Sequence, residues 1–211
     1  LNGVLLSFKA GKLSVVATDS RRLALVEHEV EFPADAEMDL IVPLKTVEEL
    51  LRTLAETGTV KILATPKQIA FEFDRVLIVS KLVEGTYPNF RQVIPQANGE
   101  RVAMERETLL TAVRRTSQLV IDAVSGVKLT FTKNRLEILA TAPEIGEARE
   151  TMDVKYKGPD IAISFNPAFL MDPLKALTTD EVYLDLLDDT SPGVLRSSIS
   201  FVYVLMPIRV S

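Results

Sequence analysis

One pattern, a strand followed by an amphipathic helix and three further strands, recurs along the chain and limits the possible fold more than any other feature. Residues 40–90 and 160–210 align at an offset of about 120 residues, a third copy spans 101–156, and 1–32 supply only strands. Because each copy has one helix stripe and one sheet face to bury, we expect pairs of copies to share a core. The predicted class is α+β, with helices on one face and antiparallel sheets on the other.

The first half of the chain is expected to form a hairpin and then the first helix. Residues 4–8 and 13–17 flank a short turn at Ala10-Gly11, which is typical of two antiparallel strands. The helix is predicted to begin at Thr46, with Glu49 in capping-box spacing, and to stop at Gly58. Its apolar stripe would comprise Val47, Leu50, Leu51 and Leu54, and strands would follow at 59–64, 68–73 and 76–83.

The second half repeats this pattern twice. A helix is predicted over 107–119, with Leu109, Leu110 and Val113 inward. Another begins after Asn166-Pro167, an N-cap followed by a proline suited to the first turn, and Pro173 should kink it or delay its regular start. Its buried face would contain Leu170, Leu174 and Leu177, and the remaining strands are expected at 101–104, 127–132, 135–141, 147–156, 161–165, 182–187, 194–201 and 203–210.

Composition excludes several kinds of site. The 211 residues include no cysteine, which removes disulfides and thiolate chemistry, and a single histidine, His28, expected to be exposed at a strand end. No apolar run approaches the roughly 20 residues of a membrane span, and no secretion signal is apparent. The chain starts inside a strand-like pattern without Met, as a fragment cut inside a domain would. No cofactor or metal site is expected.

Carboxylates are the only candidates for catalysis. Asp185, Asp188 and Asp189 cluster near a predicted strand end, and a metal-dependent or acid–base hydrolase would need such groups to converge. They precede Thr190-Ser191-Pro192-Gly193, which favours a solvated turn instead. The sequence therefore contains no convincing active site, and we expect no enzyme.

Basic residues recur away from the apolar stripe of each predicted helix. If the helices share one side, these residues would form a weakly positive strip on a chain whose formal net charge is −5. Glutamates on the same faces favour ordinary solvated helices equally well. The residues of this strip are Lys45, Arg52, Arg106, Arg114, Arg115 and Lys175.

Two apolar segments stand out from the sheets and helices. The connector Ser80–Pro95 is irregular around Gly85 and Pro88, yet it carries Tyr87 and Phe90. It would be either a plain linker packed on its neighbours or one wall of a site. The carboxyl end is apolar to within a residue of the terminus, and Pro207 cannot continue a central strand. This tail would lie in the core or at a binding surface.

These segments together resemble the bacterial replicative sliding clamp, the beta subunit of DNA polymerase III. The resemblance runs in order along the chain through LNGVLLSF, VATDSRRLAL, IVPLKTVEELLRTL, SKLVEGTYPNFRQVIP, SFNPAFLMDPLKAL and YVLMPIRV. It implies the DNA-clamp fold, with residues 1–87 as a truncated middle domain, 88–100 as a connector and 101–211 as a complete C-terminal domain.

The resemblance also implies a function. In this family two subunits close head to tail into a homodimeric ring around double-stranded DNA, helices line the hole, and the ring tethers its partners without catalysis. Implied partners are the polymerase III catalytic subunit, the clamp loader and other replication or repair proteins, in the bacterial cytoplasm at the nucleoid. The ring contact would fall near Gln118 and Leu119. A peptide-binding scaffold without a DNA role remains the alternative.

A partner-peptide groove between the middle and C-terminal domains is the family's binding site. Several positions depart from the family pattern: Arg21 stands for a histidine, Gln92 for an arginine and Phe169 for a tyrosine. Ser191 replaces an aliphatic residue. The matched positions are Leu1, Thr18, Arg21, Leu23, Pro88, Gln92, Val93, Asn166, Phe169, Ser191, Gly193, Val204, Met206, Pro207, Ile208 and Arg209.

Overall fold

The computed structural model describes residues 3–96, 99–120 and 126–208. The chain divides into two compact units. The first comprises Leu1–Asp19 and Ala24–Phe90, and the second comprises Ser20–Leu23 and Arg91–Ser211. The short segment 20–23 therefore packs with the second unit, although its neighbours along the chain belong to the first.

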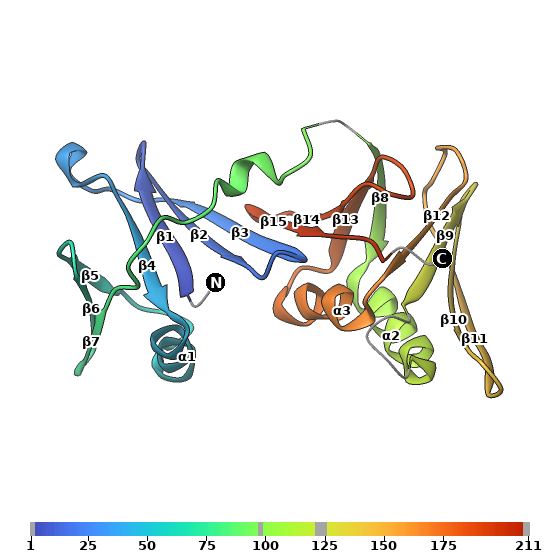
Figure 1. Cartoon of the computed structure of the whole chain (residues 1–211), viewed down its shortest axis with the longest axis horizontal. Coiled ribbons are helices and arrows are strands. Elements are labelled where there is room, and N and C mark those ends of the chain that lie inside the picture. Colours follow the sequence, from blue (N-terminus) through green and yellow to red (C-terminus); the bar gives the residue numbers. More distant parts are fainter. Residues whose placement is uncertain (1–2, 97–98, 121–125, 209–211) are drawn as a thin grey trace. The chain divides into compact units, whose positions relative to one another are not determined.

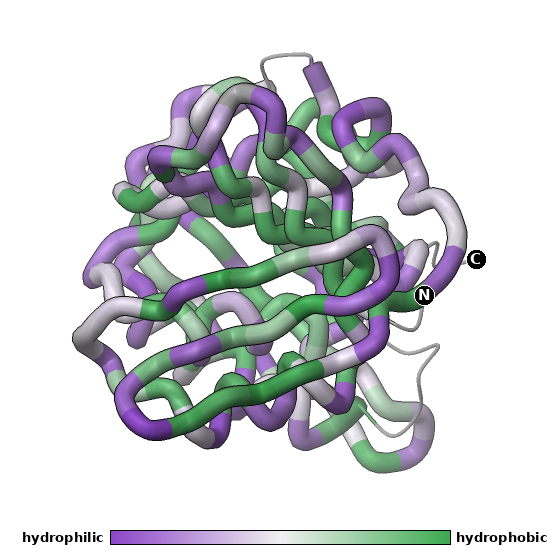
Figure 2. Tube along the Cα trace, turned by 90° about the vertical axis from the view of Figure 1, so that its left-hand side faces the viewer, coloured by the Kyte–Doolittle hydropathy of each residue, from purple (hydrophilic) through white to green (hydrophobic). Residues whose placement is uncertain are grey.

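The first unit contains a four-stranded sheet, one helix and a three-stranded sheet (Figure 1). Its hydrophobic core joins Leu40 and Val42 to Ile69, Phe71 and Phe73. In Figure 2 the side with the three-stranded sheet faces the viewer, and hydrophobic stretches recur along its strands between hydrophilic turns. In chain order the elements are β1 (Gly3–Lys9), β2 (Lys12–Thr18), β3 (Arg22–Glu29), the 3-10 turn η1 (Ala34–Ala36), β4 (Met38–Pro43), α1 (Leu44–Thr53), β5 (Lys61–Ala64), β6 (Gln68–Phe73) and β7 (Val76–Lys81).

The predicted hairpin is confirmed. β1 pairs antiparallel with β2, with Leu5 opposite Val16 and Lys9 opposite Lys12. Its two turn residues both have positive φ, 50° at Ala10 and 71° at Gly11. Two consecutive positive φ angles match the right-handed twist of the strands in a two-residue hairpin, and glycine takes such an angle without strain.

Helix α1 differs from its prediction at both ends. It begins at Leu44, directly after Pro43, and ends at Thr53, so neither the Thr46 capping box nor the stop at Gly58 is correct. Thr46 is buried instead, and its hydroxyl donates to Ser80 Oγ at 2.7 Å. The side chain thus ties the first turn of the helix to β7.

The apolar stripe of α1 is also narrower than predicted. Val47 and Leu50 pack against the core, but Leu51 is 79% exposed. Its counterpart in the repeat, Leu174, is fully buried, because α3 (Pro167–Ala176) packs against a second helix of its own unit. Within the described residues of the first unit, α1 has no helix partner, so this flank stays in solvent.

The second unit contains two complete copies of the repeat, and each four-stranded sheet combines three strands of one copy with the first strand of the other. β12 pairs with β9, and β8 pairs with β13. The sheet orders are therefore β11-β10-β9-β12 and β15-β14-β13-β8. The elements are the 3-10 turn η2 (Phe90–Gln92), β8 (Glu100–Glu105), α2 (Arg106–Thr116), the 3-10 turn η3 (Ser117–Leu119), β9 (Val127–Thr132), β10 (Arg135–Ala142), β11 (Gly146–Asp153), β12 (Ile161–Phe165), α3, β13 (Glu181–Leu186), β14 (Gly193–Ser197) and β15 (Phe201–Leu205).

Both helices of the second unit bury the residues that their periodicity predicts. Leu109, Leu110 and Val113 of α2 are buried, and so are Leu170 and Leu174 of α3 and Leu177 directly after it. The first helix ends earlier than predicted, at Thr116, and the 3-10 turn η3 covers the last three residues of the predicted helix. Asn166 caps α3 as expected, because its Oδ1 accepts from the backbone N–H of Ala168 at 2.9 Å.

Pro173 lies inside α3 without delaying its start, since the helix runs from Pro167 to Ala176. A proline has no N–H, so the carbonyl four residues earlier, at Phe169, loses its helical donor. The Tyr203 hydroxyl from β15 donates to that carbonyl at 2.9 Å. A neighbouring strand therefore supplies the hydrogen bond that the proline removes.

The last two strands are shorter than predicted. β14 ends at Ser197 and β15 runs from Phe201 to Leu205, where the sequence pattern suggested 194–201 and 203–210. Residues 198–200 form the turn between them, because Arg196 pairs with Val202 in the register. Pro207 lies beyond the strand end, as its missing N–H requires.

We predict that Tyr203→Phe lowers the free energy of unfolding by roughly 1–2 kcal/mol, because the part-buried Phe169 carbonyl would lose its donor. Urea unfolding of the whole chain measures this change. Tyr183→Phe is the matched control, since that hydroxyl donates only to the exposed side chain of Glu181. An equal loss in both variants would contradict the compensation of Pro173 by Tyr203.

Candidate functional site

The segment Ser20–Leu23 meets the carboxyl-terminal tail within the second unit. The backbone N–H of Met206, directly after β15, donates to the Arg21 carbonyl at 2.9 Å. Leu23 is 2% exposed, whereas the side chain of Arg21 is exposed. The structure thus brings Met206 to the segment that contains Arg21 and Leu23, although about 180 residues separate Met206 from that segment in sequence.

Arg22 fixes this segment on α3 and β15. Its guanidinium lies over the ring of Phe169, 4.1 Å from the centroid, and its Nη1 donates to Asp172 Oδ2 at 2.5 Å. The same nitrogen lies 3.5 Å from the Tyr203 hydroxyl. Sequence reasoning missed Arg22, Asp172 and Tyr203. Asp172 has no partner near it in sequence, so the only available signal was that Arg22 adjoins Arg21.

The tail presents apolar side chains while its backbone is held. Met206 is 45% exposed, and Pro207 and Ile208 are half-buried. The backbone N–H of Ile208 donates to the Ser164 carbonyl of β12 at 2.7 Å. We refer to Arg21–Leu23, Phe169 and Met206–Ile208 together as the tail surface.

Other predicted residues belong to the same unit as the tail surface. Val93 is 47% exposed, and Gln92 is exposed at the end of the 3-10 turn η2. Val204 is buried in β15. Gly193 is required by packing, because a Cβ there would lie 2.9 Å from Cζ of Phe165. Ser191 is half-buried and donates to the Asp188 carboxylate.

The remaining predicted groove residues belong to the first unit or fall outside the described residues. Thr18, which is half-buried, and Pro88, which is exposed, belong to the first unit. Leu1 and Arg209 fall outside the described residues.

Tyr87 anchors the connector to the first unit. The Tyr87 hydroxyl donates to the carbonyl of Val16 in β2 at 3.1 Å, within the first unit. Burial raises the pKa of Tyr87 above its ordinary value, because it disfavours the ionised form of the hydroxyl. The connector therefore leaves the first unit from a fixed point.

The clustered carboxylates are committed to structural contacts. Burial alone would raise the pKa of Asp185, but hydrogen bonds from Arg101 and Arg196 outweigh it and hold the pKa below the ordinary value. Asp188 has a pKa of about 2, because it accepts from the backbone and hydroxyl groups of Thr190 and Ser191. This is the predicted turn. Within the described ranges, no three His, Cys, Asp or Glu side chains gather as a metal would require.

The basic helix residues fall into two groups. Lys45, Arg114 and Lys175 are exposed, and the side chain of Arg52 is 72% exposed beside Glu49. Arg106 is a correction to the predicted strip: its side chain is only 14% exposed, and it donates to the carbonyls of Thr179 at 2.7 Å and Leu174 at 2.9 Å. Its charge holds the end of α3 and is not free for a ligand.

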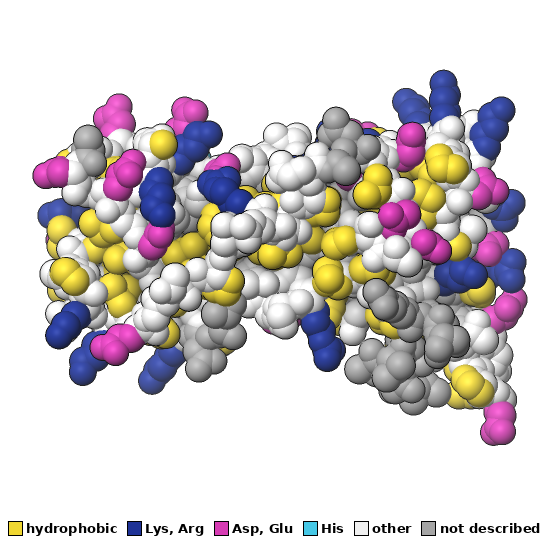
Figure 3. Space-filling model, turned by 45° about the horizontal axis from the view of Figure 1, so that its top comes forward, with side chains coloured by type: hydrophobic (Ala, Val, Ile, Leu, Met, Phe, Trp, Pro, Cys, Tyr) yellow, Lys and Arg dark blue, Asp and Glu magenta, His cyan; other side chains and the backbone are white. Residues whose placement is uncertain are grey.

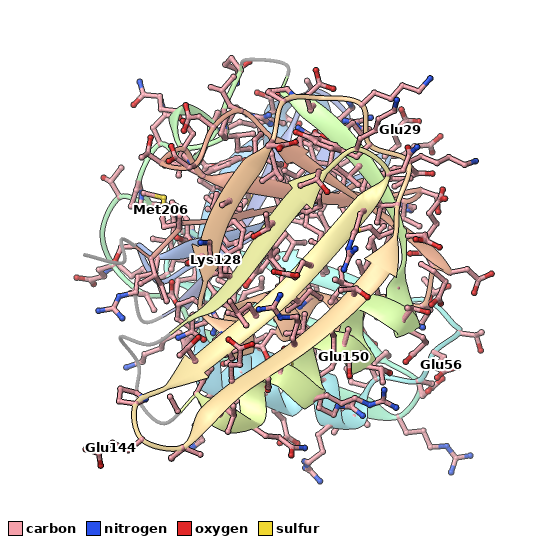
Figure 4. All side chains as sticks on the ribbon, turned by 90° about the vertical axis from the view of Figure 1, so that its right-hand side faces the viewer. Glu29, Glu56, Lys128, Glu144, Glu150 and Met206 are labelled. Carbon is pink, nitrogen blue, oxygen red and sulfur yellow. The ribbon has the colours of Figure 1, made fainter. Side chains whose placement is uncertain are left out.

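Acidic residues accompany the basic ones. Arg115 Nη1 lies 3.5 Å from Oε1 of Glu150, which Figure 4 shows on β11 beside α2. Figure 3 brings forward the side away from the helices of Figure 1, and there too Lys and Arg side chains are interspersed with Asp and Glu. Gln118 is exposed and Leu119 half-buried on η3. In the part of the chain that the structure describes, no helix is long and apolar enough to cross a membrane.

Comparison with known proteins assigns both parts of the chain. Residues 1–89 match the family model of the DNA polymerase III beta subunit, central domain, and residues 91–209 match that of its C-terminal domain. The "Beta sliding clamp" of Pseudomonas aeruginosa is 34% identical over 99% of the chain and 58% of its own length. That of Chlamydia pneumoniae is 32% identical over 99% and 57%.

Solved structures agree with this assignment. The DNA polymerase III subunit beta of Pseudomonas aeruginosa is similar with a TM-score of 0.94 and 34% identity, over 100% of this chain and 59% of that one. A sliding clamp from Bartonella birtlesii, solved bound to griselimycin, has a TM-score of 0.92 and 34% identity, over 99% and 58%. The chain therefore spans somewhat more than half the length of these relatives. The predicted clamp fold is confirmed, and the chain belongs to the DNA polymerase III beta subunit family, the bacterial sliding clamps.

Proposed function

We propose that this chain is part of a sliding clamp that encircles double-stranded DNA and tethers replication proteins to it. The observation that carries this proposal is the match to clamp structures along the whole chain, at a TM-score of 0.94. The proposed role is topological and requires neither catalysis nor a cofactor. The engaged carboxylates Asp185 and Asp188 are consistent with it. We place the protein in the bacterial cytoplasm, at the nucleoid.

The helices are the proposed DNA-facing elements. Lys45, Arg52, Arg114, Arg115 and Lys175 would meet phosphates without reading bases. Ion pairs of Arg52 with Glu49 and Arg115 with Glu150 would keep the attraction weak. Weak, sequence-independent contacts suit a ring that slides.

The tail surface is the proposed site for short partner peptides. Exposed Met206 and Val93 offer apolar contacts, and Arg21 and the polar groups nearby could orient a glutamine side chain. The proposed partners are the polymerase III catalytic subunit, the clamp loader and other replication or repair proteins. By family resemblance, Leu1, Thr18, Pro88 and Arg209 would complete the site. Gln118 and Leu119 would contribute to the homodimeric ring in the full-length protein.

We predict that a pentapeptide carrying a glutamine and bulky apolar residues binds the chain in the micromolar range, about −8 kcal/mol. Met206→Ala should weaken binding by roughly 1–2 kcal/mol, because it removes a central apolar contact. Leu23→Ala should also weaken it. Fluorescence anisotropy with a labelled peptide measures both.

The matched control is Ile145→Ala, which truncates another exposed apolar residue of the second unit, 63% exposed on the β10–β11 turn. Its affinity should equal that of the unmodified chain. Griselimycin should displace the peptide, since a relative has been solved with it bound. Unchanged affinity in both Met206→Ala and Leu23→Ala would refute the assignment of the tail surface.

A second prediction concerns DNA. Binding of the chain to a short linear duplex should weaken as salt rises. Arg114→Gln and Lys175→Gln should each reduce the slope of log K against log salt by roughly 0.9 for each phosphate that the variant no longer neutralises. Equilibrium titrations at several salt concentrations test this.

Arg106→Gln is the control variant in the same titrations. It should leave the salt slope unchanged and lower the stability of the chain instead, because its donors hold the carbonyls of Leu174 and Thr179. Binding without salt dependence, or an Arg106 effect as large as that of Arg114, would favour the peptide-binding scaffold without a DNA role.

A further inference from the structure

A polar cavity of about 550 Å³ lies in the second unit, where the end of the connector covers the sheet β15-β14-β13-β8. Ile94, Pro95 and Gln96 form one side of it. Arg101 of β8, Asp185 of β13 and Arg196 of β14 supply its charged groups. None of these charged residues belongs to the tail surface or to the basic helix faces.

Strand register explains why the three charges converge. Asp185 lies directly opposite Arg101 in the β8–β13 pair, and Arg196 lies opposite Tyr183, two residues from Asp185 on the same face. Arg101 donates from Nε to Oδ1 at 2.6 Å and from Nη2 to Oδ2 at 2.9 Å. Arg196 Nε donates to Oδ2 at 2.9 Å.

The cluster carries an excess of one positive charge and unused donors. Asp185 takes three N–H groups, and within the described chain no hydrogen bond is made by either Nη of Arg196 or by Nη1 of Arg101. Glu181, on the same face of β13, accepts from the Tyr183 hydroxyl. Glu100 lies on the opposite face by strand alternation, where its Cγ approaches Gly158. An anion entering the cavity would therefore meet guanidinium groups that still have donors to offer.

The cavity adjoins the proposed peptide site at two points of the chain. Val93, a predicted groove residue, is followed by Ile94 of the cavity, and Gly193, another, is followed by Val194, which also lines it. Ile94 and Arg196 line the same cavity, so an extended peptide held at Val93 could continue past Ile94 toward Arg196. Helices α2 and α3 lie against the other face of this sheet, where Leu184 and Leu195, which alternate with Asp185 and Arg196, are fully buried.

We propose that this cavity is an accessory subsite that binds the carboxylate of an acidic residue adjacent to the apolar motif of a partner peptide. The inference deepens the proposed peptide-binding function and rests on it for the identity of the ligand. Arg196 supplies the main recognition through its free Nη groups, and Arg101 contributes Nη1. Asp185 keeps both guanidinium groups in position and reduces the affinity for any anion, which leaves the subsite selective for a peptide already held nearby.

The direct test is an NMR titration of the arginine Nε–Hε resonances in the whole ¹⁵N-labelled chain, with N-acetyl-aspartate as the probe. Saturable shifts are expected for Arg196 and Arg101, with affinity roughly tenfold lower in Arg196→Gln, because a charge-assisted hydrogen bond is lost. Arg135→Gln, an exposed arginine of β10, is the matched control and should not differ from the unmodified chain.

Asp185→Asn should change the affinity for N-acetyl-aspartate in the opposite direction to Arg196→Gln. It removes the competing charge, so N-acetyl-aspartate should bind more tightly, whereas a purely structural ion-pair cluster would show no such gain. Inorganic phosphate is the second probe. Stronger binding of phosphate than of N-acetyl-aspartate, or absence of saturable shifts, would overturn the proposal.

Peptide titration separates this subsite from the proposed function. The pentapeptide is compared with versions extended by Asp or by Asn, and the Asp version should bind several-fold more tightly only while Arg196 is present. If the neutral peptide binds and Asp adds nothing, the subsite is refuted and the peptide function stands. If no peptide binds, the peptide function fails, and the N-acetyl-aspartate titration still decides whether the cavity binds carboxylates.

Discussion

The exchange of first strands between the two repeats is the constraint on which the second unit depends. β8 completes the sheet of the later repeat, and β12 completes that of the earlier one, so neither repeat can finish its own sheet. This exchange brings Arg101, close to the connector, beside Asp185 and Arg196 far along the chain. It also sets β12 where its Ser164 carbonyl can anchor the tail. Both the tail surface and the cavity are consequences of this topology.

A proline inside a helix links fold to site. Pro173 deprives the Phe169 carbonyl of its donor, and Tyr203 supplies one from β15. The same hydroxyl lies 3.5 Å from Arg22, whose guanidinium covers the ring of Phe169 and pairs with Asp172. Helix, strand and the segment 20–23 are therefore joined through one polar group. The carbonyl that Pro173 leaves without a helical donor thus lies where α3, β15 and the segment 20–23 meet.

Much of the fold follows from local pattern, and the departures follow from tertiary context. Asn166-Pro167 predicted a helix start correctly because capping depends on neighbouring residues alone. Leu51 and Leu174 occupy equivalent positions, yet only Leu174 has a helix partner, and no periodicity could distinguish them. The sequence predicted an exposed Arg106, but in the structure its guanidinium donates to a carbonyl at the end of α3. The pair Arg22–Asp172 spans 150 residues, so neither local pattern nor composition could reveal it.

The tail surface combines an exposed side chain with a fixed backbone, and this combination suits a binding site better than an ordinary chain end. Met206 is half exposed, but its N–H is bound to Arg21, and the N–H of Ile208 is bound to Ser164. Pro207 between them has a restricted φ and no donor to satisfy. Little backbone entropy remains to be lost when a partner binds, and the flexible thioether of Met206 can still adapt to different apolar side chains. Such a site would keep its own backbone in place while it exchanges partners of varied sequence, which suits the proposed role as a shared tether for several replication proteins.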